Sequence, residues 1–271
     1  MKTKVITLLL FISASLNLQA QDFKGIATYE AKMTLPESAT ENEKMAQLDD
    51  EMQKAIKEAM ESALHKTYTL TFDKNASLFA VEKKLAPANP MLSISLEIDG
   101  DGVLYKNIRE NKLVIETDLF EKEFLITDSL RKYEWKLEPD TKKIGNYTCY
   151  KATAIIKAEA KDKEETDELI LLGGEPQDTK LTVWYTPEIP VSHGPSKFWG
   201  LPGLILEAND GVTTYLCSKI VLNPKNKVEI KTPKKGQKIS AAEFEELSLK
   251  KAKEFEDANG GGEGQMIIIG G

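Results

Sequence analysis

Short segments that alternate apolar and polar residues recur along most of this 271-residue chain, and they constrain the fold more than any other feature. Residues 68–72 read Tyr-Thr-Leu-Thr-Phe, and Asp73-Lys74-Asn75 follows them as a turn. A period of two places every second side chain on one face, as in a half-buried β-strand. The pattern predicts a β-rich α+β fold with a single curved antiparallel sheet, arranged as an incomplete-barrel-like meander. The expected strands cover residues 26–33, 68–72, 78–81, 93–96, 103–108, 113–115, 124–126, 133–137, 145–156, 181–185, 204–206, 212–222 and 228–230.

Two segments have a helical period instead. Between residues 37 and 65, apolar residues recur at spacings of three and four behind the capping box Thr40-Glu41-Asn42-Glu43. The second segment, residues 240–255, opens with the similar sequence Ser240-Ala241-Ala242-Glu243. We therefore expect two amphipathic helices. The first is a helical insertion that lies against the inner face of the sheet.

The N-terminus has the composition of a secretory signal. Lys2 and Lys4 precede an apolar run that is too short to span a bilayer, and Leu18-Gln19-Ala20 then offers a small residue at the cleavage position. Residues 1–20 are therefore predicted to be a signal peptide, cleaved between Ala20 and Gln21. The protein is expected to be periplasmic or secreted.

The remaining chain is predicted to be one domain over residues 21–259, followed by a Gly-rich apolar tail over residues 260–271. Loss of Lys2 and Lys4 from the 36 basic residues leaves 34 against 43 acidic ones, a formal charge of −9. Nucleic acid is not expected as a partner, because its phosphates are bound by clustered basic residues. No segment after the signal has the roughly 20 apolar residues of a membrane helix.

Proline and glycine give the region after residue 185 a distinct path. Pro187 and Pro190 remove backbone donors and lead the chain out of the sheet. Leu201-Pro202-Gly203-Leu204 fits a type II turn, in which Gly203 would supply the positive φ. We expect Gly200-Leu201-Pro202-Gly203-Leu204-Ile205 to be a structural corner that returns the chain to the sheet. A binding or catalytic role is the alternative.

The chain has two cysteines, Cys149 and Cys217. Each has a Tyr two residues before it and a Lys two residues after it, which places both on the more polar faces of their strands. An even number of cysteines in an exported protein favours a disulfide, provided that the two strands are neighbours. Such a bridge would stabilise the fold by roughly 4 kcal/mol. Two free thiols or a redox pair are the alternatives.

The sequence contains few of the residues that enzymes use. The two histidines, His65 and His193, lie 128 residues apart, without metal-ligand spacing. No phosphate-binding glycine loop or nucleophile elbow occurs. We therefore assign no catalytic, cofactor-binding or metal-binding residue and expect no cofactor. Paired carboxylates remain open, because two of 43 acids could flank a cleft.

Several segments resemble landmarks of a known family, in the expected order. They are residues 25–29, 135–137, 142–152, 184–190 and 200–205. The hexapeptide Gly200 to Ile205 resembles the signature of the GLPGLI family, which consists of exported proteins of the Bacteroidota without an assigned activity. Asp128-Ser129-Leu130 is similar to the acceptor of periplasmic O-glycosylation in the same phylum, which makes Ser129 a candidate site.

These observations favour a non-enzymatic envelope protein that binds or carries an apolar small molecule, or that binds an envelope protein partner. Two other classes stay open. One is an exported hydrolase whose carboxylate site the sequence does not reveal. The other is a structural protein that captures a partner through the apolar run at residues 266–269.

Overall fold

The computed structural model describes residues 23–34, 49, 51–54, 64–82, 102–119, 122–158, 178–226 and 228–258. Twelve strands in these residues belong to one sheet, and its strand order is β12-β6-β5-β4-β3-β2-β1-β11-β10-β9-β8-β7. The strands are β1 (Gly25–Met33), β2 (His65–Phe72), β3 (Ala76–Val81), β4 (Val103–Asn107), β5 (Lys112–Leu119), β6 (Lys122–Asp128), β7 (Lys136–Ile144), β8 (Tyr147–Ile156), β9 (Thr179–Thr186), β10 (Leu204–Asn209), β11 (Thr213–Leu222) and β12 (Gln237–Ile239).

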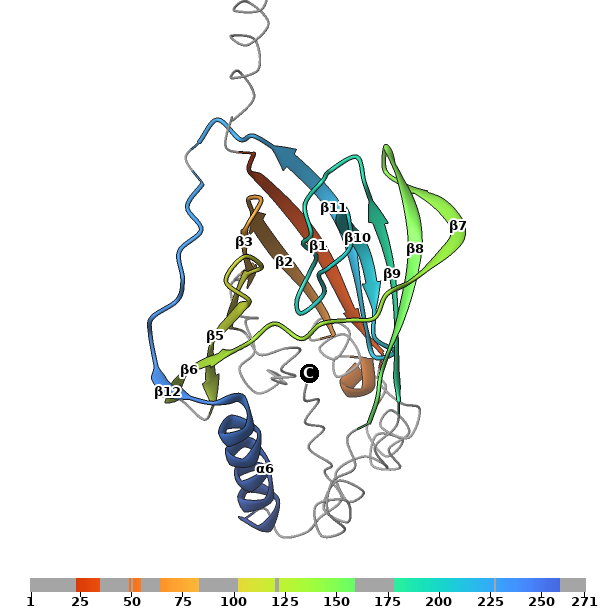
Figure 1. The fold of residues 1–271 in the computed structure, drawn as a ribbon. Helices are drawn as coiled ribbons and strands as arrows, with labels where there is room; N and C mark the ends of the chain where they lie inside the picture. The colour runs from red at the N-terminus through yellow and green to blue at the C-terminus, as the bar shows by residue number, and fades with distance from the viewer. Residues whose placement is uncertain are drawn as a thin grey trace, which may run out of the picture.

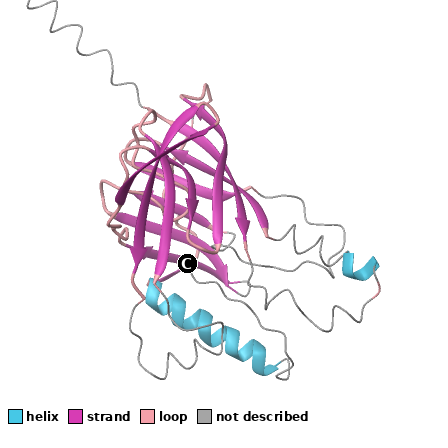
Figure 2. Cartoon of the chain, turned by 90° about the vertical axis from the view of Figure 1, so that its right-hand side faces the viewer, coloured by secondary structure: helices cyan, strands magenta, loops and turns pink. Residues whose placement is uncertain are grey.

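The predicted single curved sheet is confirmed (Figures 1 and 2). Every neighbouring pair is antiparallel except β12 and β6, which are parallel. Irregular registers in the pairs of β1 with β11 and β10 with β9 interrupt the ladder near the centre. Bulges of this kind bend a strand and increase its twist, which favours curvature.

Aromatic rings fill the inner face of the curve. Tyr68 and Phe79 stack with their ring centroids 4.7 Å apart, and Tyr215 meets both rings edge to face. Phe198, from the connection between β9 and β10, packs against Tyr215 at 6.3 Å. Offset and edge contacts are the preferred geometries of aromatic pairs. The core therefore joins neighbouring strands to a segment outside the sheet.

The second predicted helix is present as α6 (Ala241–Ala258). Its capping box forms as expected: the Ser240 hydroxyl accepts a bond from the Glu243 N–H, and the Glu243 carboxylate accepts one from the Ser240 N–H. Phe244 packs on Phe124 of β6 at 5.5 Å, so α6 is anchored at the edge of the sheet. No helix in the described residues is long and apolar enough to cross a membrane.

Two strand predictions were wrong. Residues 133–137 were expected as a strand, but the chain has no regular structure until β7 begins at Lys136. Trp135 instead uses its indole N–H to bind another loop. Residues 228–230 are also not a strand, and the sheet gains β12 in their place.

Other predictions fall mainly outside the described residues. They concern the signal peptide and its cleavage site at Ala20 and Gln21, the strand at 93–96, the tail from residue 260, and most of the first helix. Within that helix, the described residues 51–54 are helical.

Candidate functional site

The first four residues of the signature peptide, Gly200 to Gly203, lie in the connection between β9 and β10, residues 187–203, which we call the motif loop. Leu204 and Ile205 are the first residues of β10. Figure 1 shows this loop, in teal, crossing the face of the sheet over β1 and β10. Leu201 and Leu204 are buried, whereas Pro202 is exposed. The loop thus covers the apolar inner face with part of its signature.

The turn at the signature differs from the predicted type II turn. Positive φ occurs at Gly200, at 99°, and not at Gly203. Gly203 is needed for a different reason: a Cβ atom there would lie 2.2 Å from the carbonyl oxygen of Thr186. The second glycine therefore allows the loop backbone to approach β9 closely.

The motif loop is held to the sheet by a lysine that was not among the predicted site residues. Lys106 of β4 has no exposed surface. Its ammonium group donates hydrogen bonds to the carbonyl oxygens of Gly194, at 2.8 Å, and Phe198, at 2.9 Å, and to that of Ser196. We call this arrangement the lysine cage. An ammonium group has three N–H donors, so the three carbonyls can satisfy all of them.

The lysine cage provides hydrogen-bond partners for a buried ammonium group and for three buried carbonyl groups. A charged group without partners in the core is strongly unfavourable, and so is a buried carbonyl without a donor. The motif loop has little regular structure in which its own carbonyls could be paired. Charge-assisted bonds are stronger than neutral ones, so a single ammonium group fixes three points of the loop.

His193 lies next to this cage and is also fully buried. Burial, and then the charge of Lys106, lower the pKa of His193 from 6.5 to about 3, although the backbone of Asp73 acts in the opposite direction. Neither ring nitrogen makes a hydrogen bond of normal geometry to any of the described residues. The imidazole is therefore neutral at physiological pH and cannot work as a base that gains a proton near pH 7.

A segment before β7 closes over the motif loop. Residues 129–135, which we call the strap, cross the face of the sheet from β6 to β7 (Figure 1). Trp135 donates to the carbonyl of Trp199 at 2.9 Å, and Trp199 donates back to the carbonyl of Arg131 at 2.7 Å. Two reciprocal indole bonds thus join strap and loop.

The predicted disulfide is absent. Cys149 on β8 and Cys217 on β11 are free thiols, and β9 and β10 lie between their strands in the sheet. Both are buried in the core, so their assignment to polar faces was wrong. Burial raises the pKa of Cys149 to about 11 and that of Cys217 to about 12. The thiols are therefore protonated and weakly nucleophilic.

Ser129 is exposed directly after β6. Its N–H donates to the carboxylate of Asp128 at 2.6 Å. The hydroxyl is accessible, and its glycosylation stays a prediction. No group of three or more histidine, cysteine or acidic side chains that could hold a metal ion occurs in the part of the chain that the structure describes.

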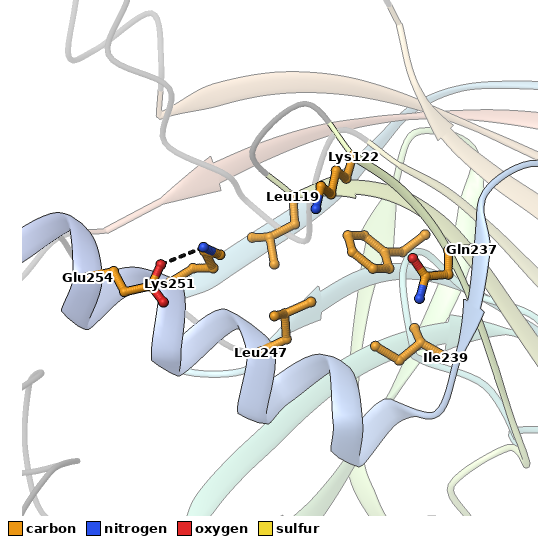
Figure 3. Close-up of a pocket in the computed structure, with 8 residues that line it drawn as sticks. Leu119, Lys122, Gln237, Ile239, Leu247, Lys251 and Glu254 are labelled. Atoms are coloured by element: carbon orange, nitrogen blue, oxygen red, sulfur yellow. Dashed lines mark hydrogen bonds and ion pairs between the residues drawn. The ribbon is translucent and has the colours of Figure 1, made fainter.

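A pocket lies at the far edge of the sheet, between α6 and strands β5, β6 and β12. Its volume is about 540 Å³. The lining residues are Leu119, Lys122, Phe124, Gln237, Ile239, Leu247, Lys251 and Glu254 (Figure 3). Gly236, at φ 104°, precedes β12, and a Cβ atom there would lie 2.7 Å from the backbone of Phe124. The missing side chain at Gly236 allows the backbone before β12 to lie against β6. The helix α6, which follows β12, then lies beside the pocket.

Neither the lysine cage nor the pocket was predicted. One signal for Lys106 existed: it shares its parity with Leu104, on an otherwise apolar face of a short strand. The pocket had no comparable signal, because β12 is a short polar segment that pairs in parallel with a strand over 100 residues away.

Replacement of Lys106 by methionine tests the cage. Lys106→Met keeps the length of the side chain but leaves three carbonyls without their donor, so we expect a loss of roughly 3 kcal/mol in the free energy of unfolding. Urea denaturation of the variant measures this loss. The matched control is Lys180→Met, at an exposed position of β9. Equal stability of Lys106→Met and wild type would contradict the cage.

The lowered pKa of His193 predicts a dependence of stability on pH. Between pH 6.5 and about 3 the unfolded chain binds a proton at His193 that the folded chain does not. The neutral ring contributes fully to the free energy of unfolding above pH 6.5. As the pH falls toward 3 this contribution is lost, and the free energy of unfolding decreases by up to about 1.4 kcal/mol per pH unit. In the variant His193→Phe, the free energy of unfolding, measured by denaturation between pH 4 and 7, should depend less steeply on pH. Parallel curves for both proteins would refute this assignment.

Part of the chain is similar to a known family. Residues 135–207, from the end of the strap through the signature to β10, match a family described as a protein of unknown function, Porph_ging. No curated protein matches the chain. Two solved structures of PNGF-II, in space groups C2 and P21, share 14% and 15% identity with it, at TM-scores of 0.49 and 0.47. They cover 84% and 85% of this chain, which spans about a third of theirs, 33% and 34%.

Proposed function

We propose that this protein is a non-enzymatic binding module of the cell envelope, and that the pocket beside α6 holds an apolar small molecule. The observation that carries the proposal is the lining of this pocket. Leu119, Phe124, Ile239 and Leu247 form apolar walls, and a few polar side chains complete them. Ligand sites usually combine these features, with volumes of roughly 300–1,000 Å³.

The rest of the inner face is less suitable for a ligand. Phe198 and Leu201 of the motif loop pack into the core cluster beside Tyr215, where they occupy the space that an open curved sheet would offer. The proposed ligand therefore binds at the edge of the sheet and not in its centre.

The chemistry of the buried groups supports binding over catalysis. His193 is neutral and enclosed, and both thiols are protonated. None of them lines the pocket. We further propose that the protein is of the GLPGLI type and is exported, as the signature and the N-terminal composition suggest. Mass spectrometry of the protein from its native envelope should then show a mature chain that begins at Gln21. A chain that retains residues 1–20 there would contradict export by cleavage.

Binding of a neutral fluorescent probe tests the pocket. Nile red should bind wild type, and Leu247→Glu should weaken this binding at least tenfold, because the apolar wall would then carry a charge. Fluorescence titration measures the affinity. Leu137→Glu, at a leucine of β7 that is 59% exposed, is the matched control and should bind as wild type does. Equal affinity of Leu247→Glu and wild type for Nile red would refute binding in this pocket. A tight complex with an envelope protein, without binding of the probe, would favour a protein partner.

A further inference from the structure

We infer that the ligand of this pocket is a single-chain amphiphile with a carboxylate head group, such as a fatty acid. The inference rests on the proposed function, since it concerns the same pocket. It adds the charge and the shape of the ligand. The observations that carry it are the two lysines of the lining and the pairing of the acidic groups around them.

The charges of the lining do not balance. Lys251 is paired with Glu254 on α6. The ammonium group of Lys122 makes no ion pair or hydrogen bond within the described part of the chain. The side chains of Lys122, Lys251 and Glu254 therefore leave a formal charge of +1 in the lining. A lone positive charge beside apolar walls complements a ligand that is apolar along its length and anionic at one end.

Two of the acidic residues nearby, Glu123 and Glu116, are engaged elsewhere. Glu123, next to Lys122, is paired with Lys235. The carboxylate of Glu116 accepts a bond from the Lys235 N–H at 3.3 Å. Neither carboxylate lines the pocket, so an anionic ligand would not face them there.

The order of the lining residues suits an elongated ligand. Leu119 and Lys122 are cross-strand partners at the end of the β5–β6 hairpin, so the free ammonium group adjoins an apolar wall. Figure 3 shows Lys251 and Glu254 at one end of the pocket and Gln237 and Ile239 at the other, with Leu119, Lys122 and Leu247 between them. A chain that runs from Lys122 toward Ile239 lies along apolar walls and has its carboxylate at the ammonium group, where a charge-assisted hydrogen bond would hold it.

Three ligands with matched parts separate the contributions of chain and head group. Laurate carries both, dodecanol has the same chain with a neutral head, and acetate has the head alone. Each is titrated below its micellar concentration against wild type loaded with Nile red. We expect laurate to bind at least tenfold more tightly than dodecanol, and acetate not to displace the probe. Each methylene removed from laurate should weaken binding roughly threefold to fourfold.

The variant Lys122→Gln removes the free charge at an exposed position and should bring the laurate-to-dodecanol ratio down to about one. Lys180→Gln on β9, at an exposed position outside the pocket, should keep the wild-type ratio. Equal binding of laurate and dodecanol to wild type would overturn the carboxylate inference and leave the apolar pocket standing. Failure of both ligands and of Nile red to bind would overturn the proposed function as well. Displacement by acetate alone would show a simple anion site and contradict the amphiphile.

Discussion

The contact between Lys106 and the motif loop is the interaction on which the rest of the structure depends. It places a full positive charge inside an apolar core, where hydrogen bonds to three carbonyl oxygens offset the cost of burying that charge. The same bonds supply donors to a loop whose backbone leaves the sheet. Strand and loop therefore stabilise each other, and neither arrangement would be favourable without the other.

This constraint determines how the curved sheet is closed. With the loop held against β4, Phe198 reaches the ring of Tyr215, and Trp199 reaches the backbone of the strap. Side chains of the motif loop thereby pack into the core cluster on the inner face. At the edge formed by β6 and β12, α6 lies beside a pocket whose lining has a different balance of charge.

The sequence could predict what depends on local pattern. Period-two alternation identified most of the strands, and the box formed by Ser240 and Glu243 identified the start of α6. It could not predict contacts between distant segments. Lys106 and Gly194 lie 88 residues apart, and an isolated lysine in a strand is usually solvated. Trp135 lies in a segment with the alternating pattern of a strand. In the structure it precedes β7, and its indole N–H donates to the carbonyl of Trp199. The cysteines were judged by their neighbours in sequence, whereas their burial depends on the packed core.

The most direct test of the central claim is NMR spectroscopy of the Lys106 ammonium group in protein labelled with ¹⁵N and ¹³C. A caged ammonium should exchange its protons slowly with water and show couplings across hydrogen bonds from Nζ to the carbonyl carbons of Gly194, Ser196 and Phe198. Rapid exchange, as for the exposed Lys180, or a neutral amine without these couplings would contradict the account. In that case the motif loop would have to be held by its apolar contacts alone.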